Sequence, residues 1–327
     1  MDIYNSLKKK SKLQNVVMTI GTFDGVHLGH LKLFEILIKK AKTINSESVV
    51  ITFDPHPQHV IGKGINPKKL LTGIDKKIKL IKKLGVDHII VIPFDINFSR
   101  LTADEFLREI IVKYFKPCSI VIGHDHHFGY KKEGNIKFLN SKKKQYHFEV
   151  TEVKADFYKN KIISSTWIRE LIESRNIKKI NLLLGRKYSI EGTVTKGDGR
   201  GRLIGFPTAN LKVQNLMLQI PENGVYLVQS WIKRKKFFGM CNIGSRPTFD
   251  SQKNKVIEVH IFNSKPMNLY DKELKIEFIQ FLRDEQKFES KEDLIDQIKI
   301  DKSICHKYLV DKDMVKKGDS FFNVNYK

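Results

Sequence analysis

The sequence predicts an α/β domain with a parallel sheet, followed by a mostly antiparallel β domain and a last helix. The length of 327 residues is about twice that of an ordinary domain, so two hydrophobic cores are expected. In the first half, short apolar runs alternate with longer segments of helical periodicity. After about residue 183, compact β segments follow one another with Gly, Pro, Asn and Asp between them, which is typical of an antiparallel barrel or sandwich.

Strands and helices alternate in the first half. Short runs rich in Val and Ile predict buried strands at residues 16–20, 48–53, 88–94 and 119–123. Apolar side chains at helical spacing predict helices at residues 31–41, 74–84 and 106–114. Thr102 and Glu105 have the spacing of a capping box at the start of the third helix. This alternation implies a parallel sheet with helices on both faces and with ligands beyond the carboxyl ends of its strands.

The second half contains five predicted β segments and a final helix. The β segments lie at residues 188–195, 224–231, 237–243, 256–262 and 274–282. Ser290 and Asp293 open a helical pattern that continues to Tyr308. We therefore expect domains at residues 1–182 and 183–310, followed by a polar tail at residues 311–327.

The composition is strongly basic: Lys and Arg together outnumber Asp and Glu by 23, and most of the basic residues are Lys. Lys lacks the planar fork with which Arg reads bases and clamps phosphates, so nucleic acid is not the expected partner. A basic nucleic-acid-binding or regulatory protein stays an open alternative, supported by the Lys excess alone. Three scattered Cys residues do not form a disulfide framework. Because no apolar run is long enough to cross a bilayer, we expect a cytoplasmic protein with no membrane partner.

A Gly-rich turn after the first predicted strand is a candidate phosphate site. It runs from Gly21 to His27-Leu28-Gly29-His30, where a helix begins. Small residues let a phosphate approach the backbone, and a helix N-terminus supplies N–H groups and a positive dipole end. Imidazoles three residues apart can face the same anion and donate hydrogen bonds to charge that develops on it. A pair of metal ligands or of surface histidines is the alternative interpretation of His27 and His30.

This stretch resembles the nucleotidylyltransferase superfamily, which carries the His-x-Gly-His signature at this place. Three further segments extend the resemblance to the prokaryotic bifunctional riboflavin kinase/FAD synthetase family. They are Thr52-Phe53-Asp54-Pro55-His56-Pro57, Gly123-His124-Asp125-His126-His127-Phe128-Gly129 and Ile163-Ser164-Ser165-Thr166-Trp167-Ile168-Arg169. The resemblance implies a Rossmann-like first domain that transfers the adenylyl group of ATP to FMN, releasing pyrophosphate, with Mg²⁺ on the triphosphate.

The resemblance also assigns roles to residues of this domain. His27 and His30 are the expected catalytic residues, which stabilise the transition state. ATP and its phosphates are expected at Gly21, Phe23, Asp24, Gly29, Ser164, Ser165, Thr166 and Arg169. FMN is expected at Asp54, His56, Pro57 and Asp125. Without the other motifs, the Ser and Thr residues would be read as an ordinary helix cap.

One departure from the family pattern concerns His126 and His127, which stand where an aromatic and often a basic residue are usual. Imidazole can still stack on a flavin or adenine, so we expect the site to be retained. A transition-metal site at residues 124–127 is the alternative. Neighbouring residues of a strand end point to opposite sides, which argues against that alternative.

The β-rich half contains a second candidate site. Its loop holds four glycines within nine residues, of which Gly197, Gly199 and Gly201 are expected to wrap the phosphates of ATP. On the glycines alone, a Gly-rich hairpin is the simpler interpretation. The following Phe206-Pro207-Thr208-Ala209-Asn210 resembles the Pro-Thr-Ala-Asn signature of the riboflavin kinase module, which implies a β-barrel. Thr208 and Asn210 lie two apart on an extended segment, so their oxygens share a face where Mg²⁺ can bridge them to ATP.

Downstream segments extend this second resemblance. Residues 241–249 look like the family's Asn-Ile-Gly-x-Arg-Pro-Thr segment, and Glu258 on the next strand matches its general base. That base accepts the proton of the ribityl 5′-hydroxyl, whereas strand alternation alone is equally consistent with an outward-facing carboxylate. Arg283 lies in the segment expected to face the flavin. Residues 263–268 depart from the family's more acidic turn, from which we expect altered flexibility only.

The two resemblances together imply a bifunctional enzyme. It phosphorylates riboflavin to FMN and adenylylates FMN to FAD, with ATP as co-substrate and Mg²⁺ as the cofactor of both steps. Riboflavin, FMN and ATP are the expected small-molecule partners, and no particular oligomeric state is predicted. A single-activity enzyme, in which the departures have silenced one domain, is the other alternative.

Overall fold

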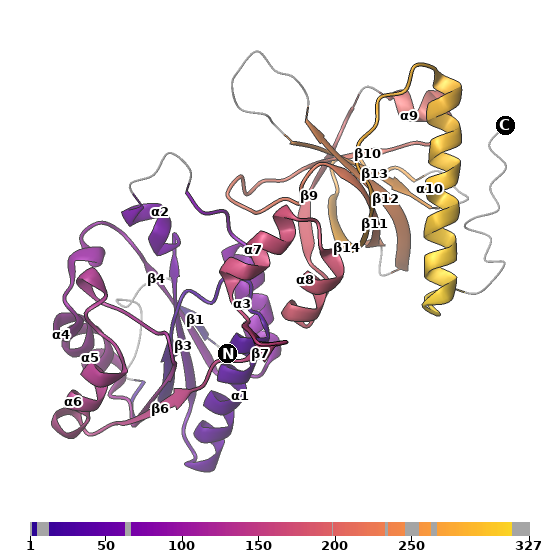
Figure 1. The fold of residues 1–327 in the computed structure, drawn as a ribbon. Helices are drawn as coiled ribbons and strands as arrows, with labels where there is room; N and C mark the ends of the chain where they lie inside the picture. Colours follow the sequence, from indigo (N-terminus) through magenta and orange to yellow (C-terminus); the bar gives the residue numbers. More distant parts are fainter. Residues whose placement is uncertain are drawn as a thin grey trace. The chain divides into compact units, whose positions relative to one another are not determined.

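The computed structural model describes residues 2–4, 13–62, 67–197, 199–232, 235–245, 255–262 and 267–315 (Figure 1). The chain divides into two compact units, Met1–Trp167 and Ile168–Lys327. The first unit contains a parallel sheet and the second a closed antiparallel barrel, which confirms the predicted fold class. The predicted domain bounds at residues 1–182 and 183–310 stay a prediction.

The first unit is built on six parallel strands in the order β1-β4-β3-β2-β5-β6. They are β1 (Asp2–Tyr4), β2 (Val17–Ile20), β3 (Ser48–Asp54), β4 (His88–Pro93), β5 (Ser119–Gly123) and β6 (Glu149–Val153). The four central strands are the four predicted ones. The two edge strands were not predicted, because β1 has three residues and β6 has no continuous apolar run, with only Val153 buried.

Different helices cover the two faces of this sheet. On one face, α1 (Leu28–Thr43) and α3 (Ile74–Lys83) pack Phe34, Leu37 and Ile81 against alternate strand residues. On the other face lie the helical segment at residues 103–115 and α6 (Ile136–Tyr146), which contribute Leu107 and Leu139. Successive strand residues point to opposite faces, so both faces of each central strand are buried and carry apolar side chains.

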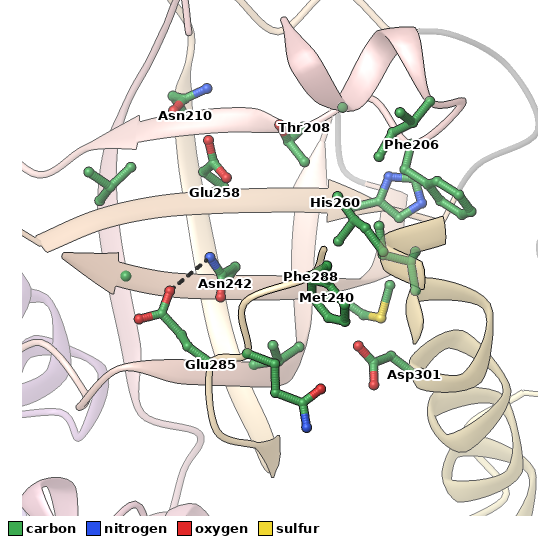
Figure 2. Close-up of a pocket in the computed structure, with 18 of the residues that line it drawn as sticks. Phe206, Thr208, Asn210, Met240, Asn242, Glu258, His260, Glu285, Phe288 and Asp301 are labelled. Atoms are coloured by element: carbon green, nitrogen blue, oxygen red, sulfur yellow. Dashed lines mark hydrogen bonds between the residues drawn. The ribbon is translucent and has the colours of Figure 1, made fainter. Parts of the chain in front are cut away.

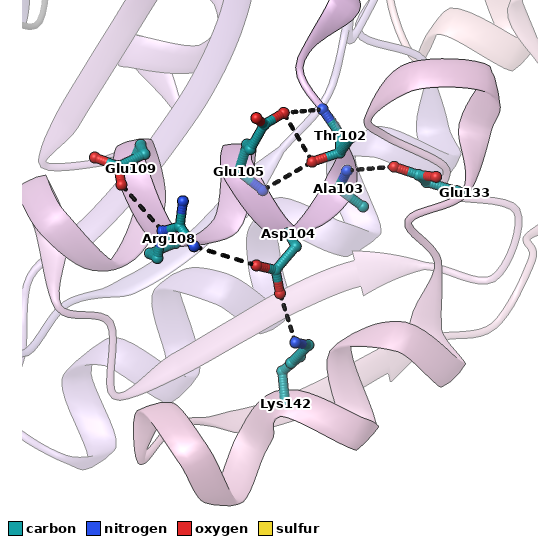
Figure 3. A network of polar contacts seen from close by, with 8 residues as sticks. All are labelled: Thr102, Ala103, Asp104, Glu105, Arg108, Glu109, Glu133 and Lys142. Atoms are coloured by element: carbon teal, nitrogen blue, oxygen red, sulfur yellow. Dashed lines mark hydrogen bonds and ion pairs between the residues drawn. The ribbon is translucent and has the colours of Figure 1, made fainter.

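The helical segment at residues 103–115 begins at the predicted capping box (Figure 3). It consists of α4 (Ala103–Glu105), the π-helical stretch η3 (Phe106–Val112) and α5 (Lys113–Phe115). The Glu105 N–H donates to Thr102 Oγ1 at 3.2 Å, and the Thr102 N–H donates to the Glu105 carboxylate at 2.9 Å. These two bonds satisfy backbone donors that a helix start leaves open, so the sequence signature is confirmed.

Short elements complete the first unit. They are α2 (Pro57–Ile61), η2 (Phe98–Arg100), η4 (Tyr130–Lys132) and the hairpin of β7 (Phe157–Tyr158) and β8 (Lys161–Ile162). α7 (Ser165–Glu173) begins in the first unit and continues into the second, to which α8 (Ile177–Leu184) belongs.

The second unit is a closed barrel of six antiparallel strands in the order β10-β13-β12-β11-β14-β9. They are β9 (Ser189–Thr195), β10 (Ala209–Lys212), β11 (Gly224–Ile232), β12 (Lys235–Ser245), β13 (Lys255–Ile261) and β14 (Glu273–Arg283). Five of them are the predicted β segments. β10 is the segment expected only to be extended, and by pairing with both β9 and β13 it closes the barrel.

Helices pack on the outside of the barrel. α10 (Lys291–Asp311) begins with Ser290 as its cap and lies along the barrel, against which Cys305 and Leu309 are buried (Figure 1). α8 contacts β14, where the Asn181 side-chain amide donates to the Phe278 carbonyl at 2.8 Å. Met314 and Val315, in the predicted polar tail, also pack against the barrel core, whereas residues 316–327 lie outside the described part. None of the helices in the described residues has the length and apolar character that a bilayer span requires.

Candidate functional site

Two strand ends meet at the centre of the parallel sheet. β3 and β4 lie on one side of β2, whereas β5 and β6 lie on the other, so the order of the strands reverses between β2 and β5. Open α/β sheets bind ligands beyond the carboxyl ends of their strands at such a reversal. The turn at residues 21–27 follows β2 and the turn at residues 124–129 follows β5, so two of the predicted motifs lie at the expected place.

The turn after β2 has backbone angles in the left-handed region, which surrounding contacts must stabilise. Phe23, Gly25 and Val26 have φ of 47°, 84° and 43°, and the left-handed region costs a residue with a side chain about 1–3 kcal/mol. Asp24, which is 1% exposed, supports the turn with its carboxylate. The carboxylate accepts the Leu71 N–H at 3.0 Å and the Thr72 N–H at 3.1 Å.

Two residues of the turn, Asp24 and Phe23, stabilise its structure. The Asp24 carboxylate fixes the turn to the chain ahead of α3, and Phe23 is buried against Phe34 with ring centroids 4.9 Å apart. A side chain on Gly21 would collide with the Phe23 ring. Contacts with ATP were predicted for Gly21, Phe23 and Asp24, and they stay predictions. Any such contact would be made by the backbone of the turn, because the Phe23 and Asp24 side chains are buried.

The two predicted catalytic histidines lie side by side. His27 is the N-cap residue of α1, and its imidazole stacks on that of His30 with centroids 3.7 Å apart and planes at 18°. A Cβ on Gly29 would lie 3.3 Å from the His27 ring, so the glycine leaves room for this imidazole. The arrangement places two imidazoles at a helix N-terminus, where the dipole favours an anion.

Gly29→Ala is expected to lower FMN adenylylation about tenfold while leaving the fold intact. The new methyl group displaces the His27 ring by a few tenths of an ångström, and small misplacements of aligned groups are costly in rate. Alanine is also the better helix former by up to about 1 kcal/mol, so the melting temperature should hold or rise. Steady-state kinetics beside thermal unfolding would check both, and an unchanged rate would contradict the role given to Gly29.

The late Ser/Thr segment lies against the same turn. The Ser165 hydroxyl donates to the Asp24 carbonyl at 2.8 Å, and Ser164 Oγ accepts the Trp167 N–H at 3.2 Å. Ser165 begins α7, Thr166 is exposed beside it, and Arg169 follows one turn later on the same helix. The structure thus brings the His-x-Gly-His turn and the start of α7 together, although 141 residues separate Ser165 from Asp24.

The residues predicted to bind FMN differ in exposure. Asp54 ends β3 and is exposed, whereas His56 is 9% exposed and accepts the Gln58 N–H through Nδ1 as the cap of α2. Pro57 is the first residue of that helix, where its fixed φ is favourable. The Asp125 side chain is exposed after β5. The Asp54 and Asp125 carboxylates can therefore reach a ligand directly, whereas the contacts of His56 and Pro57 are those of a helix start.

The histidine run after β5 does not form a cluster of metal ligands. Within the described residues, no group of three or more His, Cys, Asp and Glu side chains converges on one point. His126 lies 5.8 Å from the Phe128 ring, and burial lowers the pKa of its imidazole to about 4. The imidazole is therefore neutral at pH 7 and packs beside the Phe128 ring as an uncharged aromatic group.

Lys77 is a residue that the sequence analysis missed. It lies on α3, is 4% exposed, and its ammonium donates to Thr52 Oγ1 at 3.3 Å. Its position among the predicted apolar residues Ile74, Ile78 and Ile81 was a signal, because residues three and four apart share a helix face.

The second candidate site is a cavity of about 710 Å³ in the barrel unit (Figure 2). Predicted residues Gly199, Gly201, Thr208, Asn210, Glu258 and Arg283 all line it. Glu258 on β13 pairs in register with Asn210 on β10 and with Asn242 on β12, so its carboxylate lies between two amide side chains. Glu258 therefore faces the cavity, and the alternative of an outward-facing carboxylate is wrong.

The Gly-rich loop lies directly over the predicted cation ligands. A side chain on Gly197 would clash with the Asn210 amide, and one on Gly201 would clash with the Phe206 carbonyl. Gly199 has φ of 72°, which suits glycine. Thr208 and Asn210 present oxygen donors beside the Glu258 carboxylate, which is the donor type that a hard cation such as Mg²⁺ prefers.

Further polar residues of the cavity were not singled out from the sequence. Asn242 donates to the Glu285 carboxylate at 3.5 Å (Figure 2). The same carboxylate accepts a hydrogen bond from Asn223 at 3.0 Å. His260 Nδ1 donates to the Pro207 carbonyl at 2.9 Å and so anchors the residue before Thr208. These pairings join strands far apart in sequence, and only a strand-pairing register reveals them.

Arg283 lines the cavity as predicted, and each of its three side-chain nitrogens donates to a protein acceptor. Its Nε and Nη2 donate to the Asp301 carboxylate at 2.9 and 2.8 Å, and Nη1 donates to the Asp284 carbonyl at 2.9 Å. The Asp301 side chain is 3% exposed, so this bidentate pair holds the end of β14 to α10. Its guanidinium also lies over the Phe288 ring. The predicted contact of Arg283 with the flavin stays a prediction. Residues 246–249 and 263–266 of the predicted motifs lie outside the described residues.

Comparison with known proteins agrees with both sites. A family model described as FAD synthetase matches residues 9–167, and one described as riboflavin kinase matches residues 184–309. A bifunctional riboflavin kinase/FMN adenylyltransferase of Buchnera aphidicola subsp. Schizaphis graminum is 42% identical over 93% of this chain and 96% of its own. The protein of the same description from Bacillus subtilis is 36% identical over 91% and 94%.

A solved structure has the same fold throughout. A Streptococcus pneumoniae crystal structure, described as a macrolide-efflux protein, superposes with a TM-score of 0.83 at 30% identity over 93% of this chain and 98% of its own. The similarity in sequence to the curated relatives runs through both units, and each family model falls on one of the two candidate sites. The chain therefore belongs to the family of bifunctional riboflavin kinase/FMN adenylyltransferases.

Proposed function

We propose that the chain phosphorylates riboflavin to FMN in the barrel cavity and adenylylates FMN to FAD at the turn after β2, in the cytoplasm. The observation that carries this proposal is the presence of two distinct sites in one chain. One is a stacked imidazole pair at a helix N-terminus, and the other is a carboxylate beside oxygen donors in a cavity. The first suits charge stabilisation and the second suits proton abstraction.

In the kinase step, Glu258 accepts the proton of the ribityl 5′-hydroxyl. The hydroxyl oxygen forms a bond to the γ-phosphorus of ATP while the bond from that phosphorus to the β-phosphate oxygen breaks, so FMN and ADP are formed. The N–H groups of Gly197, Gly199 and Gly201 hold the triphosphate. Thr208 and Asn210 would hold Mg²⁺, which neutralises part of the phosphate charge when bound.

In the adenylyl transfer step, an FMN phosphate oxygen attacks the α-phosphorus of ATP and pyrophosphate leaves. His27 and His30 donate hydrogen bonds to the charge that develops on the α-phosphate. Ser164, Ser165, Thr166 and Arg169 bind the β- and γ-phosphates, so that the leaving group is held in line. No covalent bond to the protein is required, because alignment and charge stabilisation carry this reaction.

Chromatography of the products made from riboflavin, ATP and Mg²⁺ tests the proposal. We expect FMN to appear first and FAD to follow, and we expect FMN with ATP to yield FAD and pyrophosphate. If neither FMN nor FAD formed, the proposed function would be wrong. If only one of the two were formed, from its own supplied substrate, the single-activity alternative would hold.

A further inference from the structure

Lys77 is a buried ammonium group that neither candidate mechanism uses. Its side chain is 4% exposed, whereas Lys79, Lys82 and Lys83 on the same helix are exposed. Removing an ammonium group from water costs several kcal/mol unless opposite charges and hydrogen bonds compensate. A Lys at such a position is therefore a poor choice for stability alone, and an apolar residue of similar length would pack there at lower cost.

The surroundings of Lys77 connect it to the adenylyl transfer site. Its Nζ donates to Thr52 Oγ1 at 3.3 Å, and Thr52 Oγ1 in turn donates to the Thr22 carbonyl at 3.2 Å. Thr22 belongs to the turn that leads to His27. A single hydroxyl group, that of Thr52, therefore links the ammonium to the backbone of the proposed phosphate site.

Two carboxylates of different elements influence this ammonium electrostatically. Burial lowers the pKa of Lys77, and the negative charges of Asp24 and Asp54 act in the opposite direction. Asp24 is held by backbone N–H groups of Leu71 and Thr72, while Asp54 is exposed at the end of β3. Through the Thr52 hydroxyl, Lys77 thus connects the strand end at which FMN is proposed to bind with the phosphate turn at Thr22.

We propose that Lys77 is a positioning residue of the adenylyltransferase, whose buried positive charge holds the turn after β2 and the end of β3 in the arrangement that accepts two anionic substrates. This inference rests on the proposed function of that site. A fixed charge in a low-dielectric environment acts over a longer range than a solvated one, so it also lowers the cost of bringing the FMN phosphate next to the triphosphate. The ammonium itself is too buried to be a ligand contact.

Lys77→Met tests this inference, because Met keeps the length of the side chain and removes the charge. We expect kcat/KM for FMN adenylylation to fall by about 10- to 100-fold, with a higher KM for FMN and ATP and a smaller loss of kcat. The melting temperature is expected to fall only slightly, because the buried Asp24 carboxylate loses a nearby positive charge but keeps the N–H donors of Leu71 and Thr72. Phosphorylation of riboflavin by the same preparation should be unchanged, because that site lies in the other unit.

Three companion variants separate charge from structure. Lys77→Arg should recover most of the activity, and Lys79→Met, which removes an exposed charge from the same helix, should behave as the wild type. Thr52→Val keeps the ammonium and removes its hydroxyl partner, so it should lose less activity than Lys77→Met. This order of activities is expected only if adenylyl transfer depends on the positive charge of Lys77 rather than on its hydrogen bond to Thr52.

The outcomes are separable from those of the proposed function. If the wild type made no FAD from FMN, the proposed function would fail irrespective of Lys77. If the wild type made FAD and Lys77→Met stayed within about twofold of it, the inference would be overturned. A marked fall in melting temperature, a variant that does not fold, or an equal loss in Thr52→Val would overturn it as well, because each would make Lys77 a structural residue only.

Discussion

Glu258→Gln is expected to lower riboflavin phosphorylation by about 10²- to 10⁴-fold, the range usual for the loss of a general base. Gln has nearly the same shape as Glu but cannot accept the 5′-hydroxyl proton. The side chain stays between Asn210 and Asn242, so the cavity and the strand pairing are preserved. Initial rates of FMN formation at saturating ATP would measure the effect, and FAD formation from supplied FMN should be unaffected.

The barrel offers a matched control for this substitution. Glu191 is an exposed carboxylate on β9 of the same barrel, and it is not among the residues that line the cavity. Glu191→Gln removes the same charge and should leave both activities unchanged. A loss of FAD formation in Glu258→Gln would contradict independent sites, and normal FMN formation would remove Glu258 from the role of base.

Replacing His27 or His30 by Ala is the second substitution for which a large effect is expected. Each change removes one hydrogen-bond donor at the developing charge, which costs about 10²- to 10³-fold in rate at comparable sites. The stacked rings act on the same phosphate, so the double variant should lose much less than the product of the two single losses. Coupled detection of pyrophosphate from FMN and ATP measures this directly.

Controls for the histidine variants come from both units. His147 is exposed with φ of 56° after α6, where Asn is well tolerated, so His147→Asn should retain full activity. FMN formation from riboflavin should persist in all of these variants. An adenylylation rate that survives the double substitution would show that the imidazoles do not stabilise the transition state.

Local patterns in the sequence predicted much of the fold and the positions of both candidate sites. The central strands are apolar on both faces, and the capping box at Thr102 and Glu105 needs only residues three apart. The His-x-Gly-His turn is likewise local, since His27, Gly29 and His30 contact one another within one helical turn. Edge strands β1 and β6 escaped prediction because a half-exposed or very short strand lacks a continuous apolar run.

By itself, therefore, the sequence determined the two-domain fold class, the order of the main elements and the residue types of both sites, because these depend on short-range periodicity and on motifs. Only the tertiary structure decided how distant residues combine. It brought Lys77 into hydrogen-bond contact with Thr52, directed Glu258 into the cavity between two amides, and paired Arg283 with Asp301. Such contacts depend on strand register and on helix packing, and no local pattern specifies which of many Lys or Asp residues will be buried.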